Sequence, residues 1–199
     1  MNEPTQSLPV SADAPDEFTG SRSEPRVSII IPVYNGAGSI SRLVSHLHDD
    51  LAMLYQLEVI LVNDASPDDN SEEVCRQVAR QRPRSVRFVN LSRNFGEHNA
   101  VMAGLTYCNG DIAVIMDDDF QNPPGEVKKL VSKLAEGFDV VFSCYETKKH
   151  HWFRNLGSRF NNLLANMMLK KPRNLYLSSF KAMNRFVIDE ITKYKGPYP

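Results

Sequence analysis

The sequence lacks any long apolar run, although 42% of its 199 residues are hydrophobic. A membrane-spanning helix needs roughly 20 consecutive apolar residues, and no window approaches that length. The N-terminus also lacks the basic and then apolar segments of a secretory signal. We therefore expect a chain that neither spans a membrane nor is exported by that route, and whose apolar residues form an ordinary globular core.

The sequence also lacks an excess of basic residues and any closely spaced cysteines, and both absences limit its possible functions. The 23 basic residues do not outnumber the 24 acidic ones, which excludes a nucleic-acid binder held by a large positive field. The cysteines Cys75, Cys108 and Cys144 are odd in number and have no close spacing, so neither a zinc motif nor a redox motif is indicated. Reduced thiols in a cytosolic protein are the simple interpretation.

Apolar residues are scarce in residues 1–25, where Pro, Ser, Asp and Glu predominate. Such a segment cannot bury enough surface to offset the entropy of ordering, so it predicts a flexible N-terminal tail. No repeat of solenoid length follows. A chain of this length then leaves residues 26–199 as one domain.

Short apolar runs alternate with helical patterns along this domain. Strands are predicted at 27–33, 57–62, 86–91, 112–116 and 139–143, and helices after residue 39, over 71–81, after residue 97 and after Pro123 and Pro124. Ser39 is expected to cap the first helix, and the two prolines to open the fourth. The alternation predicts an α/β fold, a parallel sheet with helices on both faces. Ligands of such sheets bind outside the carboxyl ends of the strands.

Polar residues stand at these predicted strand ends. Tyr34 could stack on a base and Arg93 could pair with a phosphate, although a core aromatic and an exposed arginine are the alternatives. The full set is Pro32, Tyr34 and Asn35 after the first strand, Asn63, Asp64, Ser66 and Asp68 after the second, Ser92, Arg93 and Asn94 after the third, and Asp117, Asp118, Asp119 and Gln121 after the fourth.

The run Asp117-Asp118-Asp119 crowds three negative charges after a buried strand. In an extended segment residues two apart point the same way, so Asp117 and Asp119 could face one cation. Oxygen ligands suit Mg²⁺ or Mn²⁺ rather than zinc, and such an ion could bridge the phosphates of a nucleotide diphosphate. The alternative is a solvated acidic loop in which Asp119 or Asn122 caps the next helix.

Together these motifs resemble glycosyltransferase family 2. The segments VSIIIPVYN, VNDASPDD, LSRNFGEHNAVMAGL and DIAVIMDDDFQNPPGEV follow the family's order. DDDFQNPP is similar to the polyprenyl-phosphate branch, which includes dolichol-phosphate mannose synthase and undecaprenyl-phosphate sugar transferases. The resemblance implies a GT-A fold, Rossmann-like and mostly parallel, over residues 26–199. It also implies a C-terminus that is truncated relative to the family, without its transmembrane region.

The resemblance also implies roles for individual residues. Asp118 and Asp119 would be the catalytic residues, with Asp118 touching the donor sugar. The metal would be held by Asp117, Asp119 and Gln121, and the acceptor phosphate by Arg154 and Ser158. The nucleotide sugar would contact Pro32, Tyr34, Asn35, Asn63, Asp64, Arg93, Asp117 and Asp118.

The sequence departs from the family pattern at several positions. Gly36 stands where the family often has glutamate, Asn63 where it often has aspartate, and Tyr145 where some members have arginine. The first two changes remove negative charge near the expected nucleotide. A dehydrogenase is excluded on other grounds, because the first turn lacks G-x-G-x-x-G.

The resemblance implies an inverting, metal-dependent transfer of sugar from a UDP- or GDP-linked donor to a polyprenyl phosphate. The enzyme would lie at the inner face of the membrane. Residues 152–169 are expected to form an apolar helix with basic flanks, which is either interfacial or part of the core. A homo-oligomer is possible and nucleic acid is not a partner. The alternatives are a transferase with a hydroxyl acceptor and a truncated non-catalytic nucleotide-binding module. The first would need a well-placed carboxylate base after the fifth strand, and the presence of Glu146 alone there argues against it.

Overall fold

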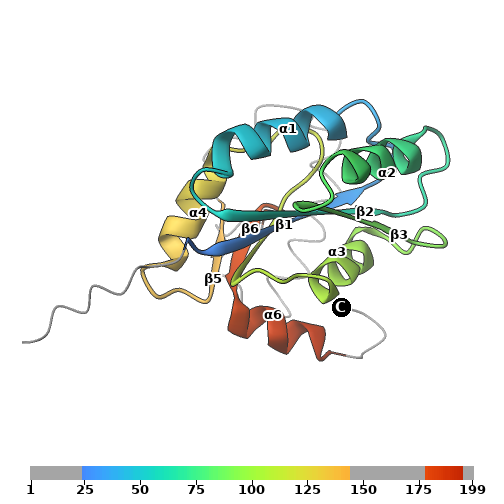
Figure 1. Cartoon of the computed structure of the whole chain (residues 1–199). Coiled ribbons are helices and arrows are strands. Elements are labelled where there is room, and N and C mark those ends of the chain that lie inside the picture. The colour runs from blue at the N-terminus through green and yellow to red at the C-terminus, as the bar shows by residue number, and fades with distance from the viewer. Residues whose placement is uncertain (1–23, 144–177, 195–199) are drawn as a thin grey trace, which may run out of the picture.

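The structure is a computed structural model that describes residues 24–143 and 178–194. Its strands alternate with helices along the chain (Figure 1). The strands are β1 (Arg26–Val33), β2 (Gln56–Asn63), β3 (Val86–Asn90), β4 (Ile112–Ile115), β5 (Val140–Phe142) and β6 (Lys181–Asn184). The helices are α1 (Ile40–Leu51), α2 (Ser71–Gln81), α3 (Glu97–Thr106), α4 (Glu126–Leu134) and α6 (Arg185–Thr192).

The described strands form one sheet in the order β3-β2-β1-β4-β6-β5. β1 to β4 run parallel to one another. β6 runs antiparallel to both of its neighbours, β4 and β5. The carboxyl ends of the four parallel strands therefore meet at a single edge, which positions the candidate site.

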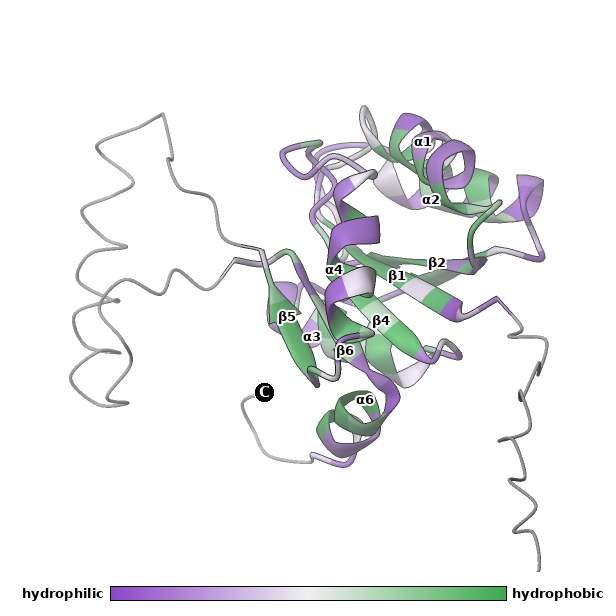
Figure 2. Ribbon diagram, turned by 90° about the vertical axis from the view of Figure 1, so that its left-hand side faces the viewer, coloured by the Kyte–Doolittle hydropathy of each residue, from purple (hydrophilic) through white to green (hydrophobic). Residues whose placement is uncertain are grey.

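Helices cover both faces of the sheet (Figure 1). On one face, α1, α2 and α4 pack on strand residues such as Ile29, Ile31 and Leu61. On the other face, α3 and α6 pack on residues such as Ile30 and Ile60. Successive residues of β1 thus enter different cores, because side chains of a strand alternate between its faces. The central strands are mostly apolar, whereas α1 and α4 carry both polar and apolar residues (Figure 2). Burial on both faces explains why β1 and β2 read as continuous apolar runs.

The predicted α/β fold and mostly parallel sheet are confirmed, and the predicted elements lie within one or two residues of their observed bounds. Two local predictions differ. Ser39 occupies the N-cap of α1 but makes no capping hydrogen bond, since its hydroxyl donates back to the Gly36 carbonyl. Pro123 and Pro124 form the turn before α4, and their carbonyls accept from the first two backbone N–H groups of the helix.

The elements β6 and α6 were not predicted from the sequence. β6 lies between β4 and β5, so the strand predicted at 139–143 is not the direct neighbour of β4. The pattern of β6 is hard to recognise, because it has four residues and carries Lys181 and Asn184 at its ends. Over residues 24–143 and 178–194, no helix combines the length and apolarity needed to cross a membrane.

Candidate functional site

A cavity of about 380 Å³ lies at the carboxyl ends of β1, β2 and β4. Because these strands are parallel, residues distant in sequence reach it together, as predicted. Seven of its lining residues come from the expected strand-end set, and Val33, Gly96 and Glu97 are additional. The lining consists of Pro32, Val33, Tyr34, Asp64, Asn94, Gly96, Glu97, Asp117, Asp118 and Asp119.

Tyr34 lines this cavity with half of its surface exposed, so the core-aromatic alternative is wrong. Its ring is accessible for stacking on a ligand. Arg93 is exposed and does not line the cavity. Its guanidinium lies 4.8 Å from the centre of the Phe95 ring.

The loops after β1 and β2 are tied together by Asn35 and Asn63. The backbone N–H of Asn35 donates to Ser66 Oγ over 2.9 Å, and its amide donates to Asp68 Oδ2 over 3.0 Å. Asn63 is buried; its amide donates to Asn90 Oδ1, and its Oδ1 accepts from Ser66 Oγ. Both side chains hold the turn together, and neither lines the cavity. Their predicted nucleotide contacts stay predictions.

Asp64 is buried and joins β2 to the start of α3. Its two oxygens accept from the backbone N–H groups of Phe95 and Gly96, each over 2.8 Å. Gly96 has φ 88°, a left-handed conformation that glycine adopts without strain. Asp64 therefore fixes the loop that carries Asn94 and Glu97 into the cavity.

The three aspartates all line the cavity but have different surroundings. Asp117 Oδ2 accepts from Ser179 Oγ over 2.5 Å. Asp119 is exposed, and its Oδ1 accepts from the backbone N–H of Gln121 over 2.9 Å. Between them lies Asp118, whose Oδ2 is buried without a hydrogen-bond partner among the described residues. The predicted crowding of three carboxylates at one place is thus present in the folded chain.

Crowding has an electrostatic consequence at Asp118. Burial, and then the charges of Asp119 and Asp117, raise the pKa of this carboxyl from 3.8 to about 6. Each of these causes disfavours the ionised form. A cation beside the aspartates would relieve the repulsion.

The surroundings of Gly36 explain why glycine stands here in place of the glutamate that is frequent in the family. A Cβ atom at position 36 would lie 1.9 Å from Asp118 Oδ2. The Gly36 backbone N–H donates to Ser71 Oγ over 2.8 Å, and that contact is buried. The Asp118 carboxylate therefore occupies the space that a larger side chain would need.

The turn after Asp119 is held from α1. Phe120 has φ 61°, and its ring lies 4.7 Å from the Arg42 guanidinium carbon and 5.6 Å from the centre of the His46 ring. Gln121 follows; it is exposed and does not line the cavity. Its predicted role as a metal ligand remains a prediction.

Carboxylates and open volume fit a hard divalent cation. Mg²⁺ and Mn²⁺ accept one or two carboxylates together with phosphate and water oxygens. In the part of the chain that the structure describes, no group of three or more His, Cys, Asp or Glu side chains is arranged to hold a metal ion by itself. The arrangement therefore suits an ion that shares its ligands with a bound phosphate better than a structural ion.

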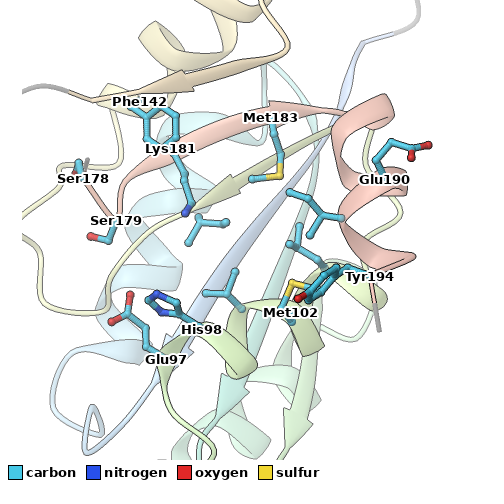
Figure 3. Close-up of a pocket in the computed structure, with 14 residues that line it drawn as sticks. Glu97, His98, Met102, Phe142, Ser178, Ser179, Lys181, Met183, Glu190 and Tyr194 are labelled. Carbon is cyan, nitrogen blue, oxygen red and sulfur yellow. The ribbon is translucent and has the colours of Figure 1, made fainter. Parts of the chain in front are cut away.

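A second cavity of about 940 Å³ lies between α3, β6 and α6 (Figure 3). Its deep wall is mostly apolar and includes Met102, Leu105 and Met183. Glu97 lines both cavities, and Ser179 lines this one while bonding to Asp117 of the other. Neither Glu97 nor Ser179 was predicted from the sequence. The position of Glu97 at the start of the helix that follows the third strand was a usable signal, and Ser179 had none.

The predicted acceptor residues Arg154 and Ser158 lie outside the described residues, as do Tyr145 and Glu146. The apolar segment 152–169 lies outside them too.

A family match agrees with the fold. The model of the family described as Glycosyl transferase family 2 matches residues 28–192, which includes every residue of the smaller cavity.

Two curated relatives have the same printed name, undecaprenyl-phosphate 4-deoxy-4-formamido-L-arabinose transferase. The one from Enterobacter sp. (strain 638) is 36% identical over 82% of this chain and 50% of its own length. The one from Serratia proteamaculans (strain 568) is 37% identical over 85% of this chain and 52% of its own length. The chain therefore spans about half the length of these relatives.

Solved structures share the fold at lower identity. A mannosyltransferase from Pyrobaculum calidifontis, in complex with GDP-Man and Mn²⁺, has a TM-score of 0.61 and 22% identity, over 85% of this chain and 47% of its own. Glucosyl-3-phosphoglycerate synthase from Mycobacterium tuberculosis, in complex with Mn²⁺, UDP and phosphoglyceric acid, has a TM-score of 0.64 and 20% identity, over 82% of this chain and 57% of its own.

Proposed function

Because the chain belongs to glycosyltransferase family 2, we propose that it binds a nucleotide diphosphate sugar and a divalent cation and transfers the sugar to a polyprenyl phosphate. The observation that carries this proposal is the convergence of Tyr34, Asp64 and the three aspartates on one cavity. The printed name of the relatives supports an undecaprenyl phosphate acceptor. The solved structures with bound GDP-Man or UDP, each with Mn²⁺, support a GDP- or UDP-linked donor and a metal.

On this proposal Asp117 and Asp119 would hold Mg²⁺ or Mn²⁺, with Gln121 as a further ligand. The ion would supply positive charge that stabilises the leaving nucleotide diphosphate. Tyr34 and Pro32 contact the nucleoside, and Asp118 faces the sugar. Arg93, which is exposed on the loop before α3, contributes a positive charge toward the phosphates.

The acceptor determines what else the site must do. A phosphate oxygen is already anionic near neutral pH, so it attacks without a general base, and the transfer proceeds with inversion. The protein then has to position two anions and neutralise them. Arg154 and Ser158 hold the acceptor phosphate, and the enzyme acts at the inner face of the membrane, where its lipid substrate lies.

Donor and metal binding can be tested without turnover. UDP and GDP should raise the melting temperature of the full chain with Mn²⁺ present, since a ligand of the native state stabilises it. In calorimetry, Asp119→Asn should weaken Mn²⁺-dependent nucleotide binding about tenfold or more. If nucleotide affinity is the same with and without Mn²⁺ in both proteins, the proposed metal site is wrong.

The acceptor site needs a separate measurement. Arg154→Ala should remove a charge-assisted contact worth about 1.5–3 kcal/mol, and thus weaken binding of a short-chain polyprenyl phosphate more than tenfold. Nucleotide affinity should be unchanged. If nucleotide affinity falls while lipid affinity persists, Arg154 belongs to the donor site.

One feature favours the second candidate, a transferase with a hydroxyl acceptor. Glu97 lines both cavities, where a carboxylate could remove the proton of an attacking hydroxyl. Glu97→Gln should leave transfer to a lipid phosphate within a few-fold of wild type. A loss of turnover with unchanged nucleotide affinity would favour the hydroxyl acceptor instead.

A further inference from the structure

The hydrogen bond between Ser179 and Asp117 joins two segments that are 62 residues apart in sequence. Its Oγ–Oδ2 distance is 2.5 Å, at the short end for a hydroxyl that donates to a carboxylate. The contact is partly buried. Asp119 accepts instead from a backbone N–H within its own turn, so Asp117 depends on a remote part of the chain in a way that Asp119 does not.

Sheet register explains why these two side chains meet. β6 pairs antiparallel with β4, and Lys181 lies opposite Ile115. Continued for two residues beyond the ladder, this register brings Ser179 opposite Asp117. Side chains opposite one another on adjacent strands lie close enough to interact. The insertion of β6 beside β4 therefore delivers a hydroxyl to the first of the three aspartates.

We propose that Ser179 is a positioning residue for the divalent cation, acting through Asp117; this inference rests on the proposed metal-dependent donor binding. A donor on Oδ2 restrains rotation of the carboxylate about its Cβ–Cγ bond and leaves Oδ1 available to the ion. Partners of this kind orient metal ligands, and their loss commonly weakens metal binding about 10- to 100-fold.

Ser179 also lines the larger cavity, beside Lys181 and across from Glu97 and His98 (Figure 3). The hydroxyl therefore stands at the boundary between that cavity and the aspartates. Ser178, its neighbour, lines the same cavity but is buried and accepts from the backbone N–H of Phe180 over 3.1 Å. Ser178 is thus a matched control, because its hydroxyl supports the same turn without contacting Asp117.

The test is a calorimetric titration of Mn²⁺ into the full chain saturated with UDP or GDP, whichever binds the wild type more tightly. Ser179→Ala should raise the Mn²⁺ concentration at half-saturation about 10-fold or more. Ser179→Thr retains the hydroxyl and should stay within about 3-fold of wild type, as should Ser178→Ala. Nucleotide affinity without metal should be equal in all four proteins.

The remaining outcomes separate a failure of the role of Ser179 from a failure of the proposed function. Unchanged half-saturation in Ser179→Ala, or an equal loss in Ser179→Thr or in Ser178→Ala, would overturn the role of Ser179 and leave the proposed function standing. If the wild type binds neither UDP nor GDP in an Mn²⁺-dependent way, the proposed function is wrong, and the role of Ser179 in metal binding is wrong with it. Urea unfolding of each variant separates a change in metal affinity from a loss of folded protein.

Discussion

Gly36 and Asp118 are matched in space, since the absent side chain of one leaves room for the carboxylate of the other. Gly36→Ala would place a Cβ 1.9 Å from Asp118 Oδ2, so one of the two must move. Overpacking of this kind typically costs about 1–3 kcal/mol. We expect a fall of that size in the free energy of unfolding, measured with urea, together with weaker Mn²⁺-dependent nucleotide binding.

Gly38 is the matched control for this substitution. It lies in the same turn, and a Cβ there meets nothing within 4 Å. Gly38→Ala should change stability by no more than about 0.5 kcal/mol. Equal effects of the two substitutions would show that the turn responds to the loss of glycine itself and not to Asp118.

Asp118 also predicts a dependence of stability on pH. Burial first, and then the charges of Asp119 and Asp117, raise its pKa from 3.8 to about 6 in the folded protein. The folded state therefore binds this proton more tightly than the unfolded chain does, and its stability falls as the pH rises from about 4 through about 6. Above that window the ionised carboxylate is a constant destabilising contribution.

Asp118→Asn removes this contribution. With a chelator present, the variant should be more stable than wild type above pH 6, and the difference should shrink as the pH falls toward 4. Urea unfolding across this range measures both curves. A difference that is constant with pH would contradict the raised pKa.

At the scale of elements, Asp64 connects the end of β2 to the start of α3. Asp64→Ala would leave the backbone N–H of Phe95 without its acceptor, and the backbone N–H of Gly96 with Asn94 Oδ1 alone. Hydrogen bonds to a charged group contribute about 1.5–3 kcal/mol. We expect a loss of that order in unfolding free energy, with faster amide hydrogen exchange in the first turn of α3.

Asp68 provides the control at this scale. It is an exposed carboxylate on the same loop and accepts from the Asn35 amide. Asp68→Ala should cost about 0.5 kcal/mol or less and leave exchange in α3 unchanged. If α3 exchanges equally fast in both variants, Asp64 does not anchor the helix.

For the whole molecule, the prediction concerns the N-terminal segment. Composition predicts that residues 1–25 are dispensable, but the Pro25 carbonyl accepts from the backbone N–H of Gln56 beside β1. Deletion of residues 1–23 should therefore leave the unfolding free energy unchanged. Deletion of residues 1–25 should cost about 0.5–1.5 kcal/mol. A marked loss in the shorter deletion would show that the segment packs on the domain.

The sequence by itself determined the elements whose patterns are local. Apolar runs marked β1 and β2, and helical spacing marked α1, α3 and α4, because burial on a sheet or helix face recurs with a fixed period along the chain. The same locality placed the three aspartates after β4 and Tyr34 after β1, at the edge where parallel strands gather ligands. The order of the motifs was sufficient to predict the family.

Tertiary structure decided the contacts between distant segments. β6 enters the sheet beside β4, Asp64 turns both oxygens to the loop before α3, and Ser179 reaches Asp117. None of these has a local pattern, since a single donor and acceptor leave no period in the sequence. Their partners become neighbours only when the sheet fixes which strands lie side by side and in which register, and that choice depends on burying both faces of the sheet at once.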